Sequence, residues 1–591
     1  MSVSPPPFFF PPPIITRLSS MAIKMYSAPG LVVLLALLCE TLGAPARSVG
    51  DSSMSVYLPV IDLGYARYRA ANYEKDGDYY LFSNIRYAAP PTGSRRFQLP
   101  EPPLYEEDIN DGSEGYLCHQ ATNIQFKWLD LLVSPGMQSE DCLFLDVAVP
   151  GWVIREQMGI FNSSLSNTTI PLGNVSGTGS SDGLPVLTWI HGGGFTFGEK
   201  AGVYNPKGLM KTAQGKMVYV AFNYRLGAFG FLAGKEVKAK GATNAGFHDQ
   251  RAALDWIHQH IGKFGGNPDD VTVMGESAGA SSILHHLVAT EDVQFHRAIL
   301  QSIASYPQYD KDVLESQYYK FASMAGCDGE DSFECLMAAD ADDLAKVNKD
   351  AVYDTLYGTF QFGPYVDRTY ITLLPLFLLG YGKHHRGVEI MAAYNTDEGF
   401  IFTDPTVVST KQFDALVVRH FPNATEEVIQ ELKDNYPESD YGSVFRRVSS
   451  IIAEWIVECN SRYLEDAYSG AYLYRVSVPP GIHSIDLPLT FWGGSQQLDS
   501  AGQSSLSVDD LADLAKSFQS YLVSFAVSGD PNKYRLTENN MPTIYFPKSD
   551  EWDGKPMVDV GKRGFSYLSL EDDGPVAKRC DYWQDGAWTG R

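Results

Sequence analysis

The chain has few basic residues for its size, and they are scattered. It contains 46 lysines and arginines against 71 aspartates and glutamates in 591 residues, so the formal charge is −25. A field of that sign repels phosphate backbones and anionic lipid surfaces and weakly attracts cationic substrates. The composition therefore argues against nucleic acid as a partner and is otherwise explained by an acidic surface kept for solubility.

Internal repeats are also absent, and no long linker interrupts the middle of the chain. Apolar residues make up 44% and aromatic residues 13% of the sequence, which is enough to fill a large core. Because α/β folds often grow large as single units, the length does not require several domains. We predict a single domain over residues 47–591.

The apolar run near the N-terminus, residues 31–38, is too short to span a bilayer. Lys24 precedes it and small residues follow at 43–46, as in a secretory signal peptide. We therefore predict that residues 1–46 are an N-terminal extension and signal peptide, with Met21 as a second candidate start. The mature protein is expected to be secreted, extracellular and without a stable membrane anchor.

Cysteine is scarce, with seven in the chain, of which six follow residue 46. An even number in an exported protein favours disulfides, and six cysteines allow fifteen pairings. The six are Cys118, Cys142, Cys327, Cys335, Cys459 and Cys580. The first two lie 24 residues apart and the next two lie eight apart, closing a small loop, whereas the last two either pair or remain buried thiols.

Four Asn-x-Ser/Thr sequences agree with export. Three of them lie in a low-complexity stretch, residues 161–183, which we interpret as a solvated surface insertion without a functional role. The predicted glycosylation sites are Asn162, Asn167, Asn174 and Asn423.

Apolar β-type runs alternate with helical patterns along the chain. Their nearly continuous apolar character is typical of strands buried in a mostly parallel sheet. Residues 249–263 have helical spacing, with Ala253, Trp256 and Ile257 on one stripe. We therefore predict an α/β fold with a large, mostly parallel central sheet flanked by helices. The main predicted strands are 184–190, 217–222, 271–274, 297–300, 388–394 and 471–478.

Residues 275–279, Gly-Glu-Ser-Ala-Gly, connect the strand at 271–274 to a helical stretch at 280–289. Small residues around Ser277 permit a tight strand-to-helix turn that projects its Oγ above the sheet edge. The pattern alone is weak, since residues 179–183 match it in a Ser/Gly/Asn-rich segment that no strand precedes. The context favours Ser277 as a nucleophile.

A serine nucleophile needs a histidine that accepts its proton and a carboxylate that orients the histidine. In a fold with this turn the chain order is serine, acid, histidine. His483 lies in a loop directly after the strand at 471–478, and Asp397 and Glu398 follow the strand at 388–394. The pattern does not choose between the two carboxylates.

The remaining downstream histidines are less suited to this role. His420, close to Asn423, is expected at the solvent-exposed surface. The others, which we interpret as structural, are His285, His286, His296, His384 and His385.

A glycine run at 192–194 follows the strand at 184–190 and can present backbone N–H groups to a developing oxyanion. No P-loop lysine or Gly-x-Gly-x-x-Gly pattern occurs there, which argues against a phosphate loop. We predict Gly193, Gly194 and Ala278 as the oxyanion-hole donors. This chemistry requires no metal ion and no organic cofactor.

Further motifs occur in collinear order with these segments. They lie at 84–97 (NIRYAAPPTGSRRF), 139–143 (SEDCL), 223–227 (NYRLG), 244–250 (NAGFHDQ) and 264–268 (FGGNP). Together they resemble the type-B carboxylesterase/lipase family, the cholinesterase-like branch of the α/β-hydrolases, and are most similar to its secreted fungal carboxylesterases. The resemblance runs from about residue 58 to 583 and implies the α/β-hydrolase fold.

The resemblance also implies a serine hydrolase that cleaves carboxylic esters through an acyl-enzyme intermediate, with Glu398 as the acid of a triad with Ser277 and His483. It implies the disulfides Cys118–Cys142 and Cys327–Cys335. In this family the first disulfide loop, residues 119–141, forms a flap over the active-site gorge.

That loop is short here, which favours an esterase acting on small-molecule or lipid esters over a triacylglycerol lipase or sterol esterase, the main alternative. Trp128 lies in its first half, not late in it where cholinesterases carry their choline-binding tryptophan. A non-catalytic, cholinesterase-like adhesion protein is a remote alternative, because all three triad positions are filled. The candidate substrate-binding residues are Phe195, Phe197, Phe229 and Trp128.

Overall fold

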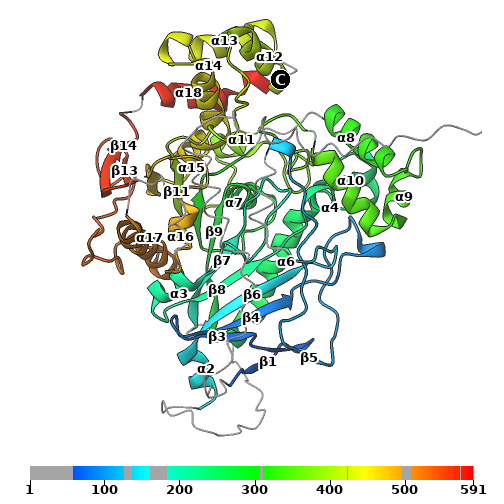
Figure 1. The fold of residues 1–591 in the computed structure, drawn as a ribbon, viewed down its shortest axis with the longest axis vertical. Coiled ribbons are helices and arrows are strands. Elements are labelled where there is room, and N and C mark those ends of the chain that lie inside the picture. Colours follow the sequence, from blue (N-terminus) through cyan, green and yellow to red (C-terminus); the bar gives the residue numbers. More distant parts are fainter. Residues whose placement is uncertain are drawn as a thin grey trace, which may run out of the picture.

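A mixed sheet of eleven strands runs through the molecule in the order β14-β13-β12-β11-β10-β9-β7-β8-β6-β4-β3 (Figure 1). The computed structural model describes residues 57–125, 136–159, 183–305, 311–353, 355–421, 424–494, 507–572 and 574–589. The sheet and its helices have the α/β-hydrolase fold that the sequence predicts.

The central strands are parallel, as their continuous apolar character predicts. They are β7 (Leu184–Ile190), β8 (Val218–Phe222), β9 (Gly266–Glu276), β10 (Arg297–Gln301), β11 (Glu389–Asn395), β12 (Tyr472–Val476) and β13 (Pro556–Gly561).

Antiparallel strands extend both edges of the sheet, and the sequence reading did not identify them. They are β3 (Asn72–Glu74), β4 (Tyr79–Arg86) and β6 (Phe144–Pro150) on one side and β14 (Gly564–Ser569) on the other. A separate three-stranded sheet contains β1 (Val60–Asp62), β2 (Arg67–Arg69) and β5 (Ile109–Asn110).

Helices cover both faces of the sheet. Successive side chains of a strand point to opposite faces, and both faces of this sheet are apolar. In β7, Val186 and Ile190 belong to one buried apolar cluster, and Leu187 and Trp189 belong to the other. The first cluster includes side chains of α6 (Ala245–His260), α7 (Ala278–Val288) and α15 (Cys459–Ala467); the second includes those of α3 (Lys207–Ala213) and α17 (Val508–Ser528).

The other α-helices of the described chain lie mainly in the connections between strands (Figure 1). They are α2 (Gly151–Gln157), α4 (Gly227–Phe231), α5 (Lys235–Lys240), α8 (Lys311–Met324), α9 (Ser332–Ala338), α10 (Ala341–Tyr353), α11 (Pro375–Gly380), α12 (Thr410–His420), α13 (Glu426–Asn435), α14 (Val444–Ala453), α16 (Leu487–Thr490) and α18 (Gly574–Asp585). None of the helices in the described ranges is long and apolar enough to cross a membrane.

Three disulfides join the six cysteines. Cys118–Cys142 and Cys327–Cys335 are the pairs that the family resemblance implies, with Cα–Cα distances of 4.9 and 5.4 Å. The third bond, Cys459–Cys580, resolves the open alternative in favour of pairing and ties α15 to α18 across a sequence separation of 121 residues. In the chain-entropy model, a disulfide restricts the unfolded chain more when it closes a longer loop, so this bond restricts it most of the three.

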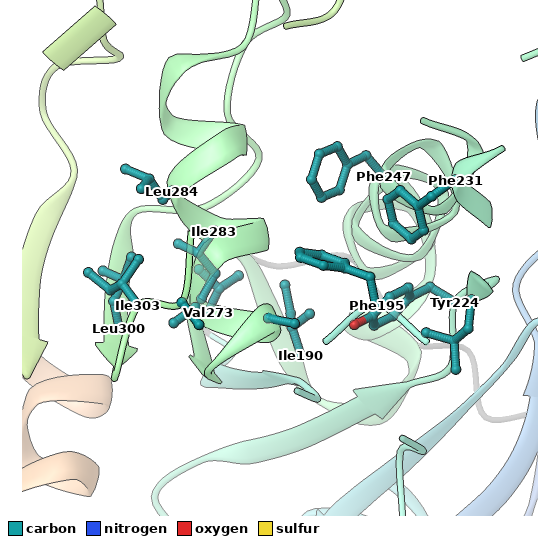
Figure 2. Close-up of a cluster of buried hydrophobic side chains, with 14 of the residues drawn as sticks. Ile190, Phe195, Tyr224, Phe231, Phe247, Val273, Ile283, Leu284, Leu300 and Ile303 are labelled. Atoms are coloured by element: carbon teal, nitrogen blue, oxygen red, sulfur yellow. The ribbon is translucent and has the colours of Figure 1, made fainter. Parts of the chain in front are cut away.

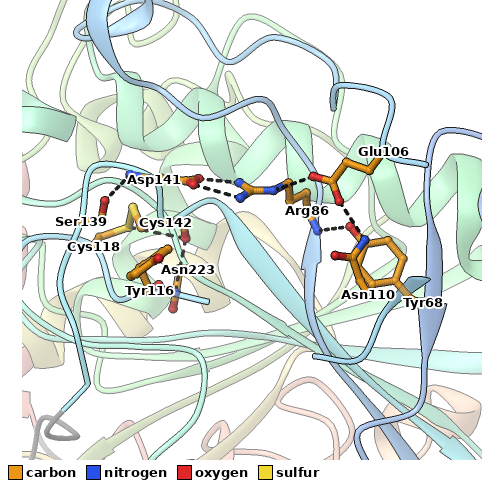
Figure 3. Close-up of polar contacts among 10 residues, drawn as sticks. All are labelled: Tyr68, Arg86, Glu106, Asn110, Tyr116, Cys118, Ser139, Asp141, Cys142 and Asn223. Carbon is orange, nitrogen blue, oxygen red and sulfur yellow. Dashed lines mark hydrogen bonds and ion pairs between the residues drawn. A yellow bond between two sulfur atoms is a disulfide. The ribbon is translucent and has the colours of Figure 1, made fainter. Parts of the chain in front are cut away.

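Arginine–carboxylate pairs hold the base of the first disulfide loop in place. Arg86 lies between Asp141, at 2.5 and 2.9 Å, and Glu106, at 3.0 Å (Figure 3). Arg96 forms a second, buried bidentate pair with Glu140 at 2.6 and 2.7 Å. Two arginine–carboxylate ion pairs therefore join the motif at 84–97 to the motif at 139–143, although the two look unrelated in sequence.

The expectation that His420 is solvent-exposed was wrong, and several other expectations lie outside the described residues. His420 is half-buried because its ring packs against Trp455, with ring centroids 5.9 Å apart. Burial lowers its pKa to about 4. The expectations that lie outside the described residues concern the signal peptide at 1–46, Trp128, and the glycosylation sites Asn162, Asn167, Asn174 and Asn423.

Candidate active site

Ser277 lies in the turn between β9 and α7 with φ 57° and ψ −121°. This is the left-handed half of backbone space, which a residue with a side chain rarely adopts. The Ser277 N–H donates to the Gln301 carbonyl of the neighbouring strand at 3.0 Å, and the Ser277 carbonyl accepts from Ser281 in the helix. These two bonds hold the serine at the carboxyl end of the sheet.

The glycines on either side of Ser277 are required by close backbone contacts. A Cβ on Gly279 would lie 2.0 Å from the carbonyl oxygen of Ile190, the last residue of β7. A Cβ on Gly275 would lie 2.6 Å from the backbone of Gly279. The glycines thus allow α7 to begin directly against the sheet.

His483 and Glu398 form a hydrogen-bonded chain with the serine. His483 Nε2 lies 2.9 Å from Ser277 Oγ, and His483 Nδ1 lies 2.5 Å from Glu398 Oε2. The other oxygen of Glu398 accepts from the Asn395 N–H at 2.6 Å. All three side chains are buried, and only the serine, with 8% of its surface exposed, retains appreciable contact with solvent.

The two adjacent carboxylates after β11 point in different directions. Glu398 is fully buried against His483, whereas Asp397 faces outward and pairs with Arg446 at 2.7 Å. The Asp397 N–H also donates to the Gly481 carbonyl at 2.8 Å. That bond joins the loop after β11 to the loop after β12, which carries His483.

A second buried carboxylate, Glu276, lies beside the same histidine. Its Oε1 is 3.3 Å from His483 Nε2 and accepts from the Ser484 hydroxyl at 2.6 Å. Burial raises the pKa of Glu276, although the charge of His483 opposes that shift. Burial alone lowers the pKa of His483, but the carboxylates of Glu398 and Glu276 outweigh it and raise the pKa to about 9.

The glycine run after β7 lies against the serine. A Cβ on Gly192 would lie 3.1 Å from Ser277 Cβ. His191 anchors the run: its Nδ1 donates to the Gly192 carbonyl at 2.8 Å, and its ring stacks on Tyr224 at 4.4 Å. Burial lowers the pKa of His191 to about 4, so this ring is neutral.

The predicted N–H donors lie on the two segments that this contact brings together. Gly193 and Gly194 have φ values of 107° and 59°, and their positions leave no space for a Cβ beside Phe197 and Phe360. Ala278 is the first residue of α7, where backbone N–H groups have no partner within the helix. Among the backbone hydrogen bonds of the described ranges, none uses the N–H groups of these three residues.

The predicted substrate-binding phenylalanines occupy different surroundings. Phe195 is buried with Phe231 and Phe247, at ring distances of 5.0 and 6.0 Å (Figure 2). Phe229 packs on Phe97 and on His119. Phe197 is half-buried, and its N–H donates to the Gly193 carbonyl at 3.1 Å. Contact of these rings with a substrate stays a prediction.

Sequence reasoning missed several residues around His483 and Glu398. Asn395 donates its side-chain amide to Ser302 Oγ at 3.0 Å and to Asp486 Oδ1 at 3.3 Å. Phe402 packs edge-on against the His483 ring at 4.9 Å. Glu276, as the neighbour of Ser277, was detectable in the sequence, whereas the partners of Asn395 come from distant segments with no common motif.

The contact between α7 and β7 leads to a stability prediction. We expect Gly279→Ala to lower the free energy of unfolding by about 3 kcal/mol, because the new Cβ forces the helix away from the Ile190 carbonyl. Gly363→Ala is the matched control, since its Cβ would meet its nearest atom at 3.8 Å. Urea denaturation measures both; equal losses of stability would contradict the close approach.

Comparison with known proteins agrees with this geometry. The sequence model of the family described as "Carboxylesterase family" matches residues 59–562. The carboxylesterase patB of Aspergillus clavatus is 31% identical, over 90% of this chain and 97% of that protein. A secreted lipase of Arthroderma benhamiae is 30% identical, over 90% of this chain and 93% of that protein.

Solved structures give the same result. The crystal structure of EstA from Aspergillus niger superposes with a TM-score of 0.73 and 26% identity, covering 90% of this chain and 99% of that one. With the family model spanning most of the chain, and with esterases among its relatives in both sequence and structure, this protein belongs to the carboxylesterase family and is a carboxylic-ester hydrolase.

Proposed function

We propose that this protein is a secreted serine esterase that cleaves carboxylic esters through a Ser277–His483–Glu398 triad and an acyl-enzyme intermediate. The observation that carries the proposal is the continuous hydrogen-bonded chain from Ser277 Oγ through both nitrogens of His483 to Glu398. A serine, a histidine and a carboxylate in this arrangement are the parts that nucleophilic acyl transfer needs.

In the first half of the reaction, Ser277 Oγ attacks the ester carbonyl carbon while His483 Nε2 takes its proton. Glu398 accepts a hydrogen bond from His483 Nδ1 and stabilises the imidazolium. The N–H groups of Gly193, Gly194 and Ala278 donate to the oxyanion that forms on the carbonyl oxygen. His483 then returns the proton to the alcohol as it leaves, and the acyl group remains on Ser277.

In the second half, water replaces the alcohol. His483 takes a proton from the water, the resulting hydroxide attacks the acyl carbon, and the same N–H groups stabilise the second oxyanion. The bond to Ser277 Oγ breaks as His483 returns the proton to it. The carboxylic acid leaves, and the serine is restored.

Two observations support secretion. Disulfides persist in oxidising compartments, and this chain has three. One relative of nearly the same length is itself described as a secreted lipase. The predicted signal peptide at 1–46 agrees with both.

The loop closed by Cys118–Cys142 favours an esterase over a lipase. Only 23 residues lie between these cysteines, and their ends are held by the ion pairs of Arg86 and Arg96. True lipases of the family that this chain resembles tend to carry a longer apolar lid at this position. Ser277 is also nearly buried, which favours small esters that can enter a narrow site.

The triad is tested by a pair of neighbouring substitutions. We expect Glu398→Gln to lower kcat by roughly 10³- to 10⁴-fold, because the histidine loses the carboxylate that orients it. Asp397→Asn is the matched control and should leave kcat nearly unchanged, since this carboxylate faces Arg446. A fluorophosphonate should label Ser277, as read by peptide mass spectrometry; an unlabelled Ser277, or equal effects of the two substitutions, contradicts the triad.

The pH dependence follows from the charges around His483. Because the base must be neutral, kcat/KM falls as pH drops through its pKa, and the carboxylates raise that pKa above the ordinary 6.5. We therefore expect the midpoint of the acid limb of the kcat/KM profile to lie above pH 6.5. Glu276→Gln removes one negative charge and should move the limb to lower pH, whereas Asp397→Asn should not. A limb that Glu276→Gln leaves in place would count against this account.

Substrate preference separates esterase from lipase. We expect higher kcat/KM on p-nitrophenyl butyrate than on an emulsified long-chain triacylglycerol, and a smooth saturation curve for tributyrin across its solubility limit. Rates are followed by p-nitrophenol release and by titration of the acid. A sharp rise in rate at the solubility limit would instead assign the protein to the lipases.

A further inference from the structure

A cavity of about 420 Å³ lies far from Ser277, at the opposite edge of the sheet. Its walls include Glu389 and Tyr472, which begin strands β11 and β12. The other ends of these strands lead to Glu398 and His483. Because a seven-residue strand is about 20 Å long, a ligand in this cavity would not touch the reacting atoms.

Basic side chains line this cavity, although the chain as a whole carries a charge of −25. Arg386 and Lys548 are both exposed, and within the described ranges neither side chain forms an ion pair. Lys548 Nζ lies 5.7 Å from the centre of the Tyr472 ring, which keeps the ammonium at the cavity wall. Arg386 and Lys548 thus give this cavity two cations. The carboxylates just outside its wall are Glu551, which accepts the backbone N–H of Lys548 at 3.1 Å, and Asp550, which accepts from the lining Ser469 at 3.0 Å.

Two further polar side chains of the wall are Glu389 and His384. Glu389 is the carboxylate among the lining residues, and Arg297 lies 3.9 Å from it and offsets part of its charge. His384 Nδ1 is buried and has no hydrogen-bond partner among the described residues. Burial and the charge of Arg386 lower the pKa of His384, whereas a hydrogen bond to the backbone of Ala467 opposes that shift. The ring is neutral, and its one N–H already has an acceptor in that bond. The buried Nδ1 is then an acceptor, so His384 adds no positive charge to the cavity and does not hold the anion.

The rest of the wall is apolar and aromatic. The Tyr468 ring packs against His384 with centroids 4.7 Å apart, and its hydroxyl donates to the His385 carbonyl at 2.7 Å. Tyr472 and Val388 contribute further apolar surface. A hydrated inorganic ion would leave this surface unused, whereas an organic anion covers it and meets the cations with its charged end.

We propose that this cavity is a second binding site for an organic carboxylate. The carboxylate lies between Arg386 and Lys548, because a guanidinium forms paired hydrogen bonds to that group. Its apolar body packs against Tyr468 and Tyr472. The site is independent of the reaction at Ser277, so the proposal does not rest on the triad.

The test is a calorimetric titration of the full-length protein with benzoate at constant ionic strength. We expect saturable binding that Arg386→Ala and Lys548→Ala each weaken by about tenfold or more, the typical effect of losing a charge-assisted hydrogen bond. Arg563→Ala, which removes an exposed arginine outside the cavity, is the matched control and should bind as the wild type does.

Three results would overturn the proposal. The first is no saturable binding of benzoate by the wild type. The second is unchanged binding in Arg386→Ala and Lys548→Ala, which would place the ligand elsewhere, the region of Ser277 included. The third is inorganic phosphate binding as tightly as benzoate, since the site would then recognise charge alone. Thermal unfolding of each variant confirms that the exposed substitutions leave the fold intact.

Discussion

The close approach of α7 to the end of β7 is the constraint on which the rest of the site depends. Gly279 lies so near the Ile190 carbonyl that no side chain fits between them. This contact forces Ser277 into a left-handed backbone conformation and brings the first N–H groups of the helix toward the glycine run after β7. The strain at one residue is offset by the buried packing of the strand and helix that it joins.

Parallel strands explain how Glu398 and His483 reach Ser277, although they lie 121 and 206 positions after it in the sequence. The loops that follow β7, β9, β11 and β12 all leave the same edge of the sheet, where ligands bind in folds of this kind. Buried ion pairs then fix the surrounding loops. Arg225 binds Asp249 at 2.7 Å, and Arg96 binds Glu140 at 2.6 Å, so the family motifs that look isolated in sequence form pairs in space.

The charge around His483 is unusual for a buried site. Glu398, Glu276 and Asp486 all lie in its surroundings, and burial raises the pKa values of the last two. A cluster of buried carboxylates is costly unless a positive charge compensates it. A protonated His483 supplies that charge, and in the proposed reaction this is the state that forms when the ring accepts the Ser277 proton.

Local chemistry determined a large part of this structure. The six main strands, the turn at Ser277 and the glycine run follow from hydrophobic patterning and from the small residues that tight turns need, so the sequence alone predicts them. The resemblance to a family, carried by the same motifs, implied Glu398 as the acid, and it implied two of the disulfides, which the structure contains. Short edge strands such as β3 lack such patterning, and they were missed.

Only the tertiary structure decided what depends on residues distant in the chain. The sequence pattern around Asp397 and Glu398 does not distinguish their roles. Packing turns Asp397 toward Arg446 and buries Glu398 against His483. The same holds for the Cys459–Cys580 pair and for the cavity beside Arg386. Sequence patterns record local preference, whereas pairing, burial and charge compensation are properties of segments that meet only after the sheet has formed.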